Sequence, residues 1–269
     1  MKSTRWWIPF LVIAGVVVIG LVVAGVVLTS LFVSRSNDLV APDGAPTLVV
    51  AVGAANGSSI DSGALDVAIG IATDRLDAAE IDYADIGRSS DHILVVFSKG
   101  TSDETRSRAR AVLTPAYSLE FRPVLAADQC DQGLTTSAIG DNVTLCDQAG
   151  TAMYALGPIA IDGKHVDSVT AATLAGAGGV DTGTWVVNLV FDDQGTQAFA
   201  DFTQRAVGQT PPLNQFAMVL DGRVLSAPAV QAAVTDGKPQ ITGGFDEAGA
   251  RDLAGRLDLA SRGLTFQVR

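Results

Sequence analysis

The hydrophobic pattern begins with one long apolar segment near the N-terminus. Residues 6–33 carry no charged side chain. Their apolar part, Trp6 to Leu28, would form a helix of roughly 35 Å, against about 30 Å for the hydrocarbon core of a bilayer. A cleaved signal peptide is the competing interpretation, but its apolar region usually spans only about 7–15 residues and ends in a small-residue cleavage site. We therefore predict an uncleaved transmembrane anchor at 6–33.

Charge around this segment predicts the topology. Two basic residues precede the apolar segment and one follows it closely, and an excess of Lys and Arg marks the cytoplasmic side. Residues 1–5 are therefore expected in the cytoplasm and the body of the chain outside it. The protein is predicted to be a single-pass protein of the cell membrane, in contact with the lipid bilayer through this helix.

After a short stalk at 34–46, strand and helix patterns alternate. Strands appear as apolar runs or as alternation at every second residue, and helices as apolar stripes at steps of three and four. Thr101-Ser-Asp-Glu104 has the form of a capping box at the start of the second helix. The strands are expected at 47–53, 82–88, 92–98 and 117–124, and the helices at 62–80 and 101–114. The order βαββαβ predicts a ferredoxin-like base lobe at 47–124, with both helices on one face of its sheet.

A second lobe, the head, is expected at 125–262. Its first part is polar and rich in Gly and Asp, and strand and helix patterns resume after it. Asp221-Gly222 lies between two short apolar runs and is the strongest hairpin signal of the chain. A last strand at 263–269 is a candidate to return to the base sheet. The fold class is α+β, and because each lobe has its own apolar stripes we expect two cores joined by a hinge.

Net charge narrows the choice of partner. All 29 acidic residues lie at or beyond Asp38, together with 15 of the 18 basic residues, so this part of the chain carries a net charge of −14. Such a balance opposes binding to nucleic acid or to anionic lipid headgroups and favours solubility. We expect no nucleic-acid partner.

The two cysteines, Cys130 and Cys146, lie in the polar part of the head. A disulfide between them in an extracytoplasmic loop would stabilise the fold by about 3 kcal/mol on the chain-entropy model. A thiol redox pair would favour Cys-x-x-Cys spacing, and a metal site would need further ligands. The structural bridge is the preferred interpretation.

No catalytic, cofactor-binding or metal-binding set can be named from the sequence. His92 and His165 each have a carboxylate nearby, but neither has the spacing of a triad or of a metal-binding face. Four acidic residues surround the cysteines without the spacing of a calcium loop, and a solvated loop is the stronger interpretation. They are Asp128, Asp131, Asp141 and Asp147. A non-enzymatic protein without cofactor is predicted, although an enzyme stays open as a distant third hypothesis.

Several motifs resemble the first large extracytoplasmic domain of the SecD family. In the head they are TWVVNLVFDDQGTQAFADFT at 184–203, FAMVLDGRVLSAPAV at 216–230 and ITGGFDEAGARDLAGRL at 241–257. In the base they are ATDRLDAAEIDYADIGRSSDHILVVF at 72–97 and SLEFRPV at 118–124. The single preceding span is similar to the family's first membrane helix. The family continues into five further membrane helices, whereas this sequence ends at Arg269, which indicates a truncated, actinobacterial-type SecD-like protein.

The resemblance implies an accessory protein that contacts polypeptide during Sec-dependent export and has no motor activity of its own. Its expected partners are components of the Sec translocon and unfolded secreted polypeptides. The candidate polypeptide contact is the strand after the Asp-Gly turn, formed by Arg223, Val224, Leu225 and Ser226, because an exposed strand can pair with an extended chain. The alternative is a cell-envelope binding or scaffold protein that uses the same fold for a different ligand.

Overall fold

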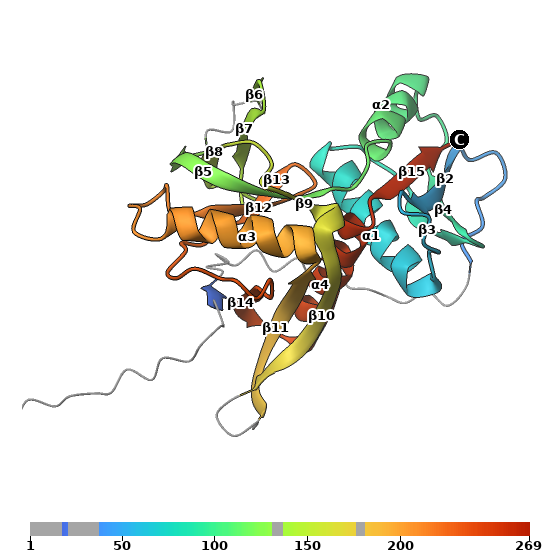
Figure 1. Cartoon of the computed structure of the whole chain (residues 1–269). Coiled ribbons are helices and arrows are strands. Elements are labelled where there is room, and N and C mark those ends of the chain that lie inside the picture. Colours follow the sequence, from blue (N-terminus) through green and yellow to red (C-terminus); the bar gives the residue numbers. More distant parts are fainter. Residues whose placement is uncertain (1–17, 21–37, 131–136, 176–180) are drawn as a thin grey trace, which may run out of the picture.

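The computed structural model describes residues 18–20, 38–130, 137–175 and 181–269. Figure 1 shows two lobes side by side, with the C-terminal strand in the base. The base sheet has the strand order β15-β2-β4-β3, and every neighbouring pair is antiparallel. Its strands are β2 (Thr47–Ala54), β3 (Asp85–Ser89), β4 (His92–Val96) and β15 (Leu264–Val268). The two base helices are α1 (Ser62–Ala78) and α2 (Asp103–Leu113).

The base sheet is completed by the C-terminal strand, which the sequence marks as a candidate to return to the base. β15 pairs with β2 along its whole length, from Leu264 opposite Ala54 to Val268 opposite Val50. The expectation that 117–124 closes this sheet is therefore wrong. Leu264 and Phe266 are buried on the helix-covered face, so the C-terminal strand supplies the apolar alternation that this position requires. The head is thus inserted between α2 and β15.

The strand predicted at 117–124 belongs to the head instead. It forms β5 (Leu119–Gln129), which lies between β12 and β8 in a seven-stranded sheet of order β13-β12-β5-β8-β7-β6, with β9 also pairing β5. The other strands are β6 (Ser137–Ile139), β7 (Asn142–Cys146), β8 (Ala152–Leu156), β9 (Ile161–Asp162), β12 (Phe216–Leu220) and β13 (Arg223–Ser226). A short 3-10 turn, η1 (Gly163–His165), follows β9.

A second sheet completes the head, in the order β1-β14-β11-β10. Its strands are β10 (Val166–Ala175), β11 (Asp181–Phe191), β14 (Gln240–Phe245) and β1 (Val18–Gly20). Helix α3 (Asp193–Ala206) lies beside the seven-stranded sheet, and α4 (Glu247–Ser261) packs on β10 and β11 and also on α1 of the base. The mixed α+β class is confirmed.

The predicted anchor falls mostly outside the described residues. Three of its positions, Val18–Gly20, form β1, which runs parallel to β14 with Ile19 opposite Ile241. A helix at these three positions is therefore not what the structure shows, because the β-branched segment pairs with backbone groups at the edge of β14. Among the residues that are described, no helix is long and apolar enough to span a bilayer.

The predicted stalk at 34–46 is described from residue 38 on. Its backbone is hydrogen-bonded to the base. The Leu39 N–H donates to the carbonyl of Arg88, and the Phe97 N–H donates to the carbonyl of Pro46. The Leu39 side chain lies against Gly87, where a Cβ would be 3.4 Å from the Cβ of Leu39. This segment therefore covers part of the base sheet.

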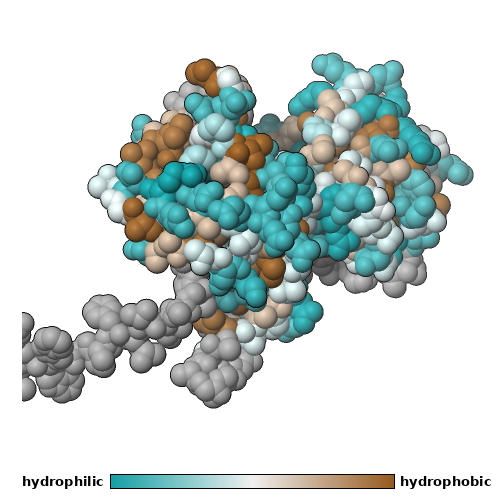
Figure 2. Space-filling view, in the orientation of Figure 1, coloured by the Kyte–Doolittle hydropathy of each residue, from teal (hydrophilic) through white to brown (hydrophobic). Residues whose placement is uncertain are grey.

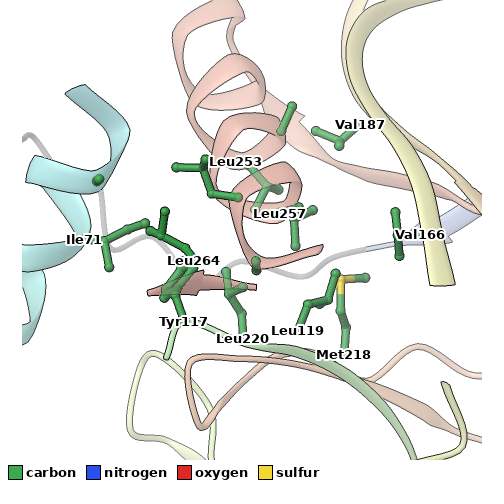
Figure 3. Close-up of a cluster of buried hydrophobic side chains, with 14 of the residues drawn as sticks. Ile71, Tyr117, Leu119, Val166, Val187, Met218, Leu220, Leu253, Leu257 and Leu264 are labelled. Carbon is green, nitrogen blue, oxygen red and sulfur yellow. The ribbon is translucent and has the colours of Figure 1, made fainter. Parts of the chain in front are cut away.

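Base and head share one buried core rather than two. A single cluster of buried side chains contains Leu65 and Leu76 of the base and Phe199 of the head, with Trp185 packed against it. Figure 3 shows Leu253 and Leu257 of α4 between Ile71 of α1 and Val187 of β11. The expectation of separate cores joined by a hinge is therefore wrong. The reason is that α4 buries apolar side chains toward both lobes, which a single apolar stripe in the sequence does not reveal.

Candidate functional site

The predicted polypeptide contact at Arg223–Ser226 forms β13 at one edge of the seven-stranded sheet. Arg223 is exposed and Leu225 is half-buried, whereas Val224 and Ser226 are buried. The loop after β7 covers part of this edge, because Asp147 pairs in parallel with Val224 and the Gln148 N–H donates to the Val224 carbonyl over 3.2 Å. Val224 also belongs to a second cluster of buried apolar side chains, which includes Leu145 of β7 and Val124 of β5. The middle of β13 is therefore already paired, and its use as a docking edge stays a prediction.

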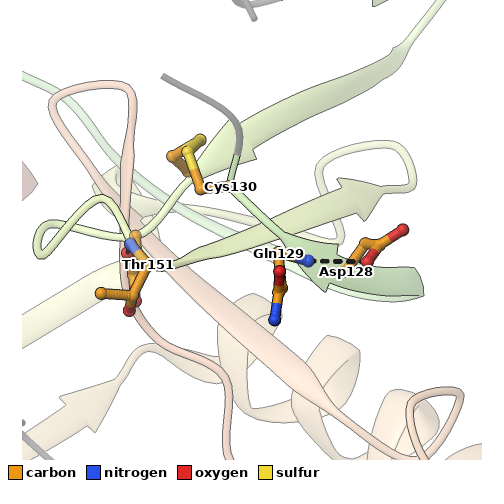
Figure 4. The surroundings of a disulfide bond; sticks show 6 residues. Asp128, Gln129, Cys130 and Thr151 are labelled. Atoms are coloured by element: carbon orange, nitrogen blue, oxygen red, sulfur yellow. Dashed lines mark hydrogen bonds between the residues drawn. A yellow bond between two sulfur atoms is a disulfide. The ribbon is translucent and has the colours of Figure 1, made fainter. Parts of the chain in front are cut away.

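The predicted disulfide is present. Cys130 and Cys146 are bonded with a Cα–Cα distance of 5.8 Å, and no free cysteine occurs among the described residues. The bridge connects the end of β5 to the end of β7, and the Cys130 N–H donates to the Thr151 carbonyl (Figure 4). It fixes the outer end of β5 against its neighbours in the sheet.

Exposed apolar side chains gather elsewhere, between the outer part of β5 and α3. A shallow pocket of about 310 Å³ lies there. It is lined by Pro123, Ala160, Phe202, Arg205, Ala206, Gln209 and Leu213. Of the described residues, six large apolar side chains are exposed. One of them, Leu213, lines the pocket, and three others follow or precede pocket-lining residues by one or two positions in the sequence: Leu125, Ile159 and Val207. Figure 2 shows apolar surface on the side of the head that faces away from the base. We treat this gathering of exposed apolar side chains as a candidate interaction surface.

An aromatic cluster supports the floor of this pocket. Phe202 lies on the inner face of α3 with its ring centroid 4.4 Å from that of Phe216, and Phe121 of β5 stacks on Phe216 at 5.6 Å. Phe199 contacts the same ring at 5.3 Å. Because these rings hold α3 and β5 together, the pocket walls are set by rigid elements and not by loops.

The N-terminus of α3 is fixed by a charged cap. Asp192 accepts a hydrogen bond from the Gly195 N–H at 2.7 Å and lies 2.9 Å from Nδ1 of His165. The Gly195 bond first, and His165 second, lower the pKa of the Asp192 carboxyl below its ordinary value. His165 is thus part of a structural pair, and His92 pairs only with its neighbour Asp91 in the base. Neither histidine lies among the residues that line the pocket.

A buried arginine, Arg122, supports the wall of the pocket that β5 forms. The Arg122 guanidinium donates to Glu120 at 2.7 Å and to the carbonyls of Gly157 and Asp141 at 2.8 and 2.9 Å. A Cβ at Gly157 would lie only 2.8 Å from Cγ of Pro123. The close approach of glycine to proline therefore allows β5 and the segment after β8 to form the pocket wall.

The outer half of β5 is exposed and paired on one side only. Residues Leu125–Gln129 are all exposed, and their ladder is formed with β8. On the side of β12, the outermost hydrogen bond among the described residues runs from the Val124 N–H to the Gln215 carbonyl at 3.1 Å. Beyond that point β5 continues outward without a β12 partner.

The side chains that line the pocket are mostly apolar, with one arginine and one glutamine. Within the described part of the chain, no group of three or more His, Cys, Asp or Glu side chains could hold a metal ion. Of the acidic residues near the cysteines, Asp147 accepts hydrogen bonds from Thr151, while Asp131 lies outside the described residues. The polar groups at the pocket are Arg205 and Gln209, whose side chains can donate to peptide carbonyls.

The sequence analysis missed this site. Leu125 and the next four residues were assigned to a polar loop, because Ala-Ala-Asp-Gln is a weak strand signal. Leu213 follows two prolines, a pattern that is typical of a turn. The one signal available was the apolar stripe of α3, since Phe202 and Ala206 needed a partner surface, but the stripe alone does not identify β5 as that partner.

Comparison with known proteins confirms the resemblance to SecD. Residues 142–261 match the family model described as SecDF, P1 head subdomain. The chain is 37% identical over 194 residues to protein translocase subunit SecD of Acetobacter pasteurianus, which covers 71% of this chain and 34% of that protein. It is 38% identical over 144 residues to SecD of Streptomyces coelicolor, covering 53% of this chain and 24% of that protein.

A solved structure has the same fold. The crystal structure of SecDF from Thermus thermophilus, a translocon-associated membrane protein, aligns with a TM-score of 0.53 and 22% identity, over 85% of this chain and 31% of that chain. The chain therefore spans about a quarter to a third of the length of these relatives. Residues 142–261 are thus similar to the P1 head subdomain of SecDF, and the similarity to SecD extends into the base.

Proposed function

We propose that this chain is a membrane-anchored, extracytoplasmic polypeptide-binding protein that assists Sec-dependent export. The observation that carries the proposal is the apolar pocket between β5 and α3, because six of its seven lining residues lie in the region that matches the SecDF P1 head. The names of its relatives, protein translocase subunits, support export as the process. An anchor at 6–33, with the N-terminus in the cytoplasm, would hold the head at the outer face of the membrane, and this arrangement requires Val18–Gly20 to leave the edge of β14.

The chemistry of the pocket suits an unfolded polypeptide. Burying one Val- or Leu-sized side chain stabilises a complex by about 1.5–3 kcal/mol. A pocket that contributes so little binds many sequences weakly, which a protein that meets diverse secreted chains requires. No covalent step is involved, so the expected role is that of a binding accessory and not of an enzyme. The Sec translocon is the proposed partner that delivers the polypeptide.

The test is site-specific photocrosslinking in cells that express the full chain. A benzophenone side chain at Leu213, which is 49% exposed at the pocket, is expected to capture secreted polypeptides during export. The matched control is the same probe at Val40, an apolar side chain of the segment before the base that is 81% exposed. Capture should depend on an active translocon and should disappear when secretion is blocked.

Two results would contradict the proposal. If neither probe captures secreted chains and loss of the protein leaves secretion unchanged, export is the wrong process. If the Leu213 probe instead captures one folded envelope component whether or not secretion is active, the chain is an envelope-binding protein that uses the same fold.

A further inference from the structure

We propose that the outer half of β5 is a strand-addition site, where an extended segment of polypeptide pairs with Ala127 and places an apolar side chain in the pocket beneath. The inference rests on the proposed function, because it names how that polypeptide is held. The site differs from the one predicted at β13, which lies at an edge of the same sheet.

The hydrogen-bond alternation of β5 determines which backbone groups are available. The Cys130 N–H donates to the Thr151 carbonyl, and the register places Gln129 opposite Ala152 and Asp128 opposite Met153. In an antiparallel ladder, hydrogen-bonded and non-bonded pairs alternate. Asp128 is therefore bonded to β8, whereas the N–H and C=O of Ala127 point to the opposite side, toward the place where β12 would continue.

Ala127 has no hydrogen-bond partner on that side among the described residues. Its neighbour Gln129 also faces that side, and its N–H is satisfied by the Asp128 side chain at 2.7 Å (Figure 4). β12 pairs with β5 only up to Phe216 opposite Pro123. An unpaired backbone donor and acceptor on an exposed strand have their best complement in another extended backbone, so the occupant indicated here is a polypeptide.

The pocket lies where an added strand would need it. Pro123 lines the pocket, and Leu125 lies beside it, since both approach the same point at Gly157. Side chains of an added strand alternate between its two faces. Those on the α3 side would meet Phe202 and Leu213, while their backbone pairs with β5. Figure 1 shows this end of β5 above α3, on the side of the head away from the base.

The disulfide gives the strand the rigidity that such a site requires. β5 continues from Gln129 into Cys130, which is bonded to Cys146 of β7. A strand fixed at its end offers its open edge without first paying the conformational entropy of ordering five residues. The bridge thus prepares the binding edge and does not merely close a loop.

A backbone test separates strand addition from simple pocket binding. The full chain in lipid nanodiscs is titrated with a fluorescent peptide of alternating Val and Thr, with a lysine at each end. In A127P the donor that faces the added strand is removed while the β8 ladder is kept, because proline is tolerated where an N–H points to solvent. The matched control A127V keeps the N–H and favours the strand. We expect about tenfold weaker binding for A127P and an unchanged affinity for A127V.

Two further measurements keep the proposal falsifiable. The first is the infrared amide I band of the same peptide with an isotope-labelled central carbonyl, which should move to the β-sheet position on binding to the wild-type chain. The second is L213D, which should also weaken binding, with L213M as its control. A labelled band that stays at the unpaired position overturns the inference, even if A127P fails to fold.

The outcomes distinguish this inference from the proposed function. If the wild-type chain binds and L213D alone weakens binding, the pocket holds polypeptide without strand addition, so the proposed function survives and the inference fails. If both variants bind as the wild-type chain does, the peptide sits elsewhere and the inference fails. If the wild-type chain binds no peptide and captures no secreted chain at Leu213, both fail together.

Discussion

Arg75 on α1 is predicted to be the most important polar residue for holding the head on the base. Its guanidinium forms a bidentate ion pair with Asp221 of the head hairpin, with Nε–Oδ2 at 2.9 Å and Nη2–Oδ1 at 2.6 Å. It also donates to the carbonyl of Leu113 at the end of α2 and to that of Pro115 in the connector between the lobes, at 3.1 and 2.8 Å. Its carbon Cζ lies 5.0 Å from the ring centre of Phe266 on β15. One side chain therefore joins α1, the connector, the hairpin and the returning strand.

The magnitude of this contribution follows from burial. The Arg75 side chain is only 9% exposed, whereas Asp221 is 30% exposed. Hydrogen bonds to charged groups contribute about 1.5–3 kcal/mol each in partly buried settings. In R75M, Asp221 can recover some hydration, and the carbonyls can bind water, so the losses do not add in full. We expect R75M to lower the free energy of unfolding by about 3 kcal/mol, and the melting temperature by about 6–12 °C.

The matched variant is D221N. Asp221 has a positive φ of 51° in the turn, and asparagine tolerates this conformation. The substitution therefore removes the charge while keeping the turn, and should cost about 1 kcal/mol. In a double-mutant cycle, the losses of unfolding free energy in R75M and in D221N should add up to more than the loss in the double variant. The difference, which is the coupling energy of the pair, should be about 1–2 kcal/mol. Urea unfolding followed by circular dichroism measures all three. If R75M costs less than about 1 kcal/mol, Arg75 does not hold the lobes together.

Two further predictions concern the bridge and the tyrosines. Replacing Cys130 and Cys146 by serine should lower the free energy of unfolding by about 3 kcal/mol on the chain-entropy model. It should also weaken binding of the Val-Thr peptide while the far-UV circular dichroism spectrum stays close to that of the wild-type chain. An equal affinity in that variant would show that the bridge does not order β5. For the tyrosines, burial first and the nearby Asp77 second raise the pKa of Tyr83 to about 12, and burial also raises the pKa of Tyr117 and of Tyr154. A raised pKa stabilises the fold below pH 10, the unfolded value, and this contribution is lost as pH rises through the folded value. Phenolate absorbance at 295 nm should therefore appear well above pH 10 in the folded protein and near pH 10 in urea, and an increase near pH 10 without unfolding would contradict the burial.

Local patterns predicted most of the elements but not all of their partners. The base helices are found at 62–78 and 103–113, close to the predicted 62–80 and 101–114. Ser102, and not Thr101, caps the second one by accepting from the Thr105 N–H. The hairpin at Asp221-Gly222 is confirmed, with both residues at positive φ and β12 paired to β13. Caps and turns depend on neighbouring residues, which is why the sequence indicates them.

Strand partners depend on contacts between distant residues, and here the sequence was less informative. The segments at 117–124 and 264–268 both alternate, so either could have closed the base sheet. The structure assigns β15 to that place because Leu264 and Phe266 bury well against the base helices. The outer half of β5 was missed for a related reason. Its exposed Ala and polar residues carry no burial signal, although its pairing with β8 makes it a strand.

The insertion of the head into the base has a mechanical consequence. The chain leaves the base after α2, passes through the whole head, and returns only as β15, so the last base strand is joined to the base through the head. α4, which directly precedes β15, packs on both lobes and is fixed to α1 by the ion pair of Arg256 with Asp74 at 2.6 Å. Unfolding the head would therefore withdraw α4 and release β15 from the base sheet. The two lobes should unfold in one transition, and the pocket beside β5 should keep a fixed position relative to the base while it holds a polypeptide.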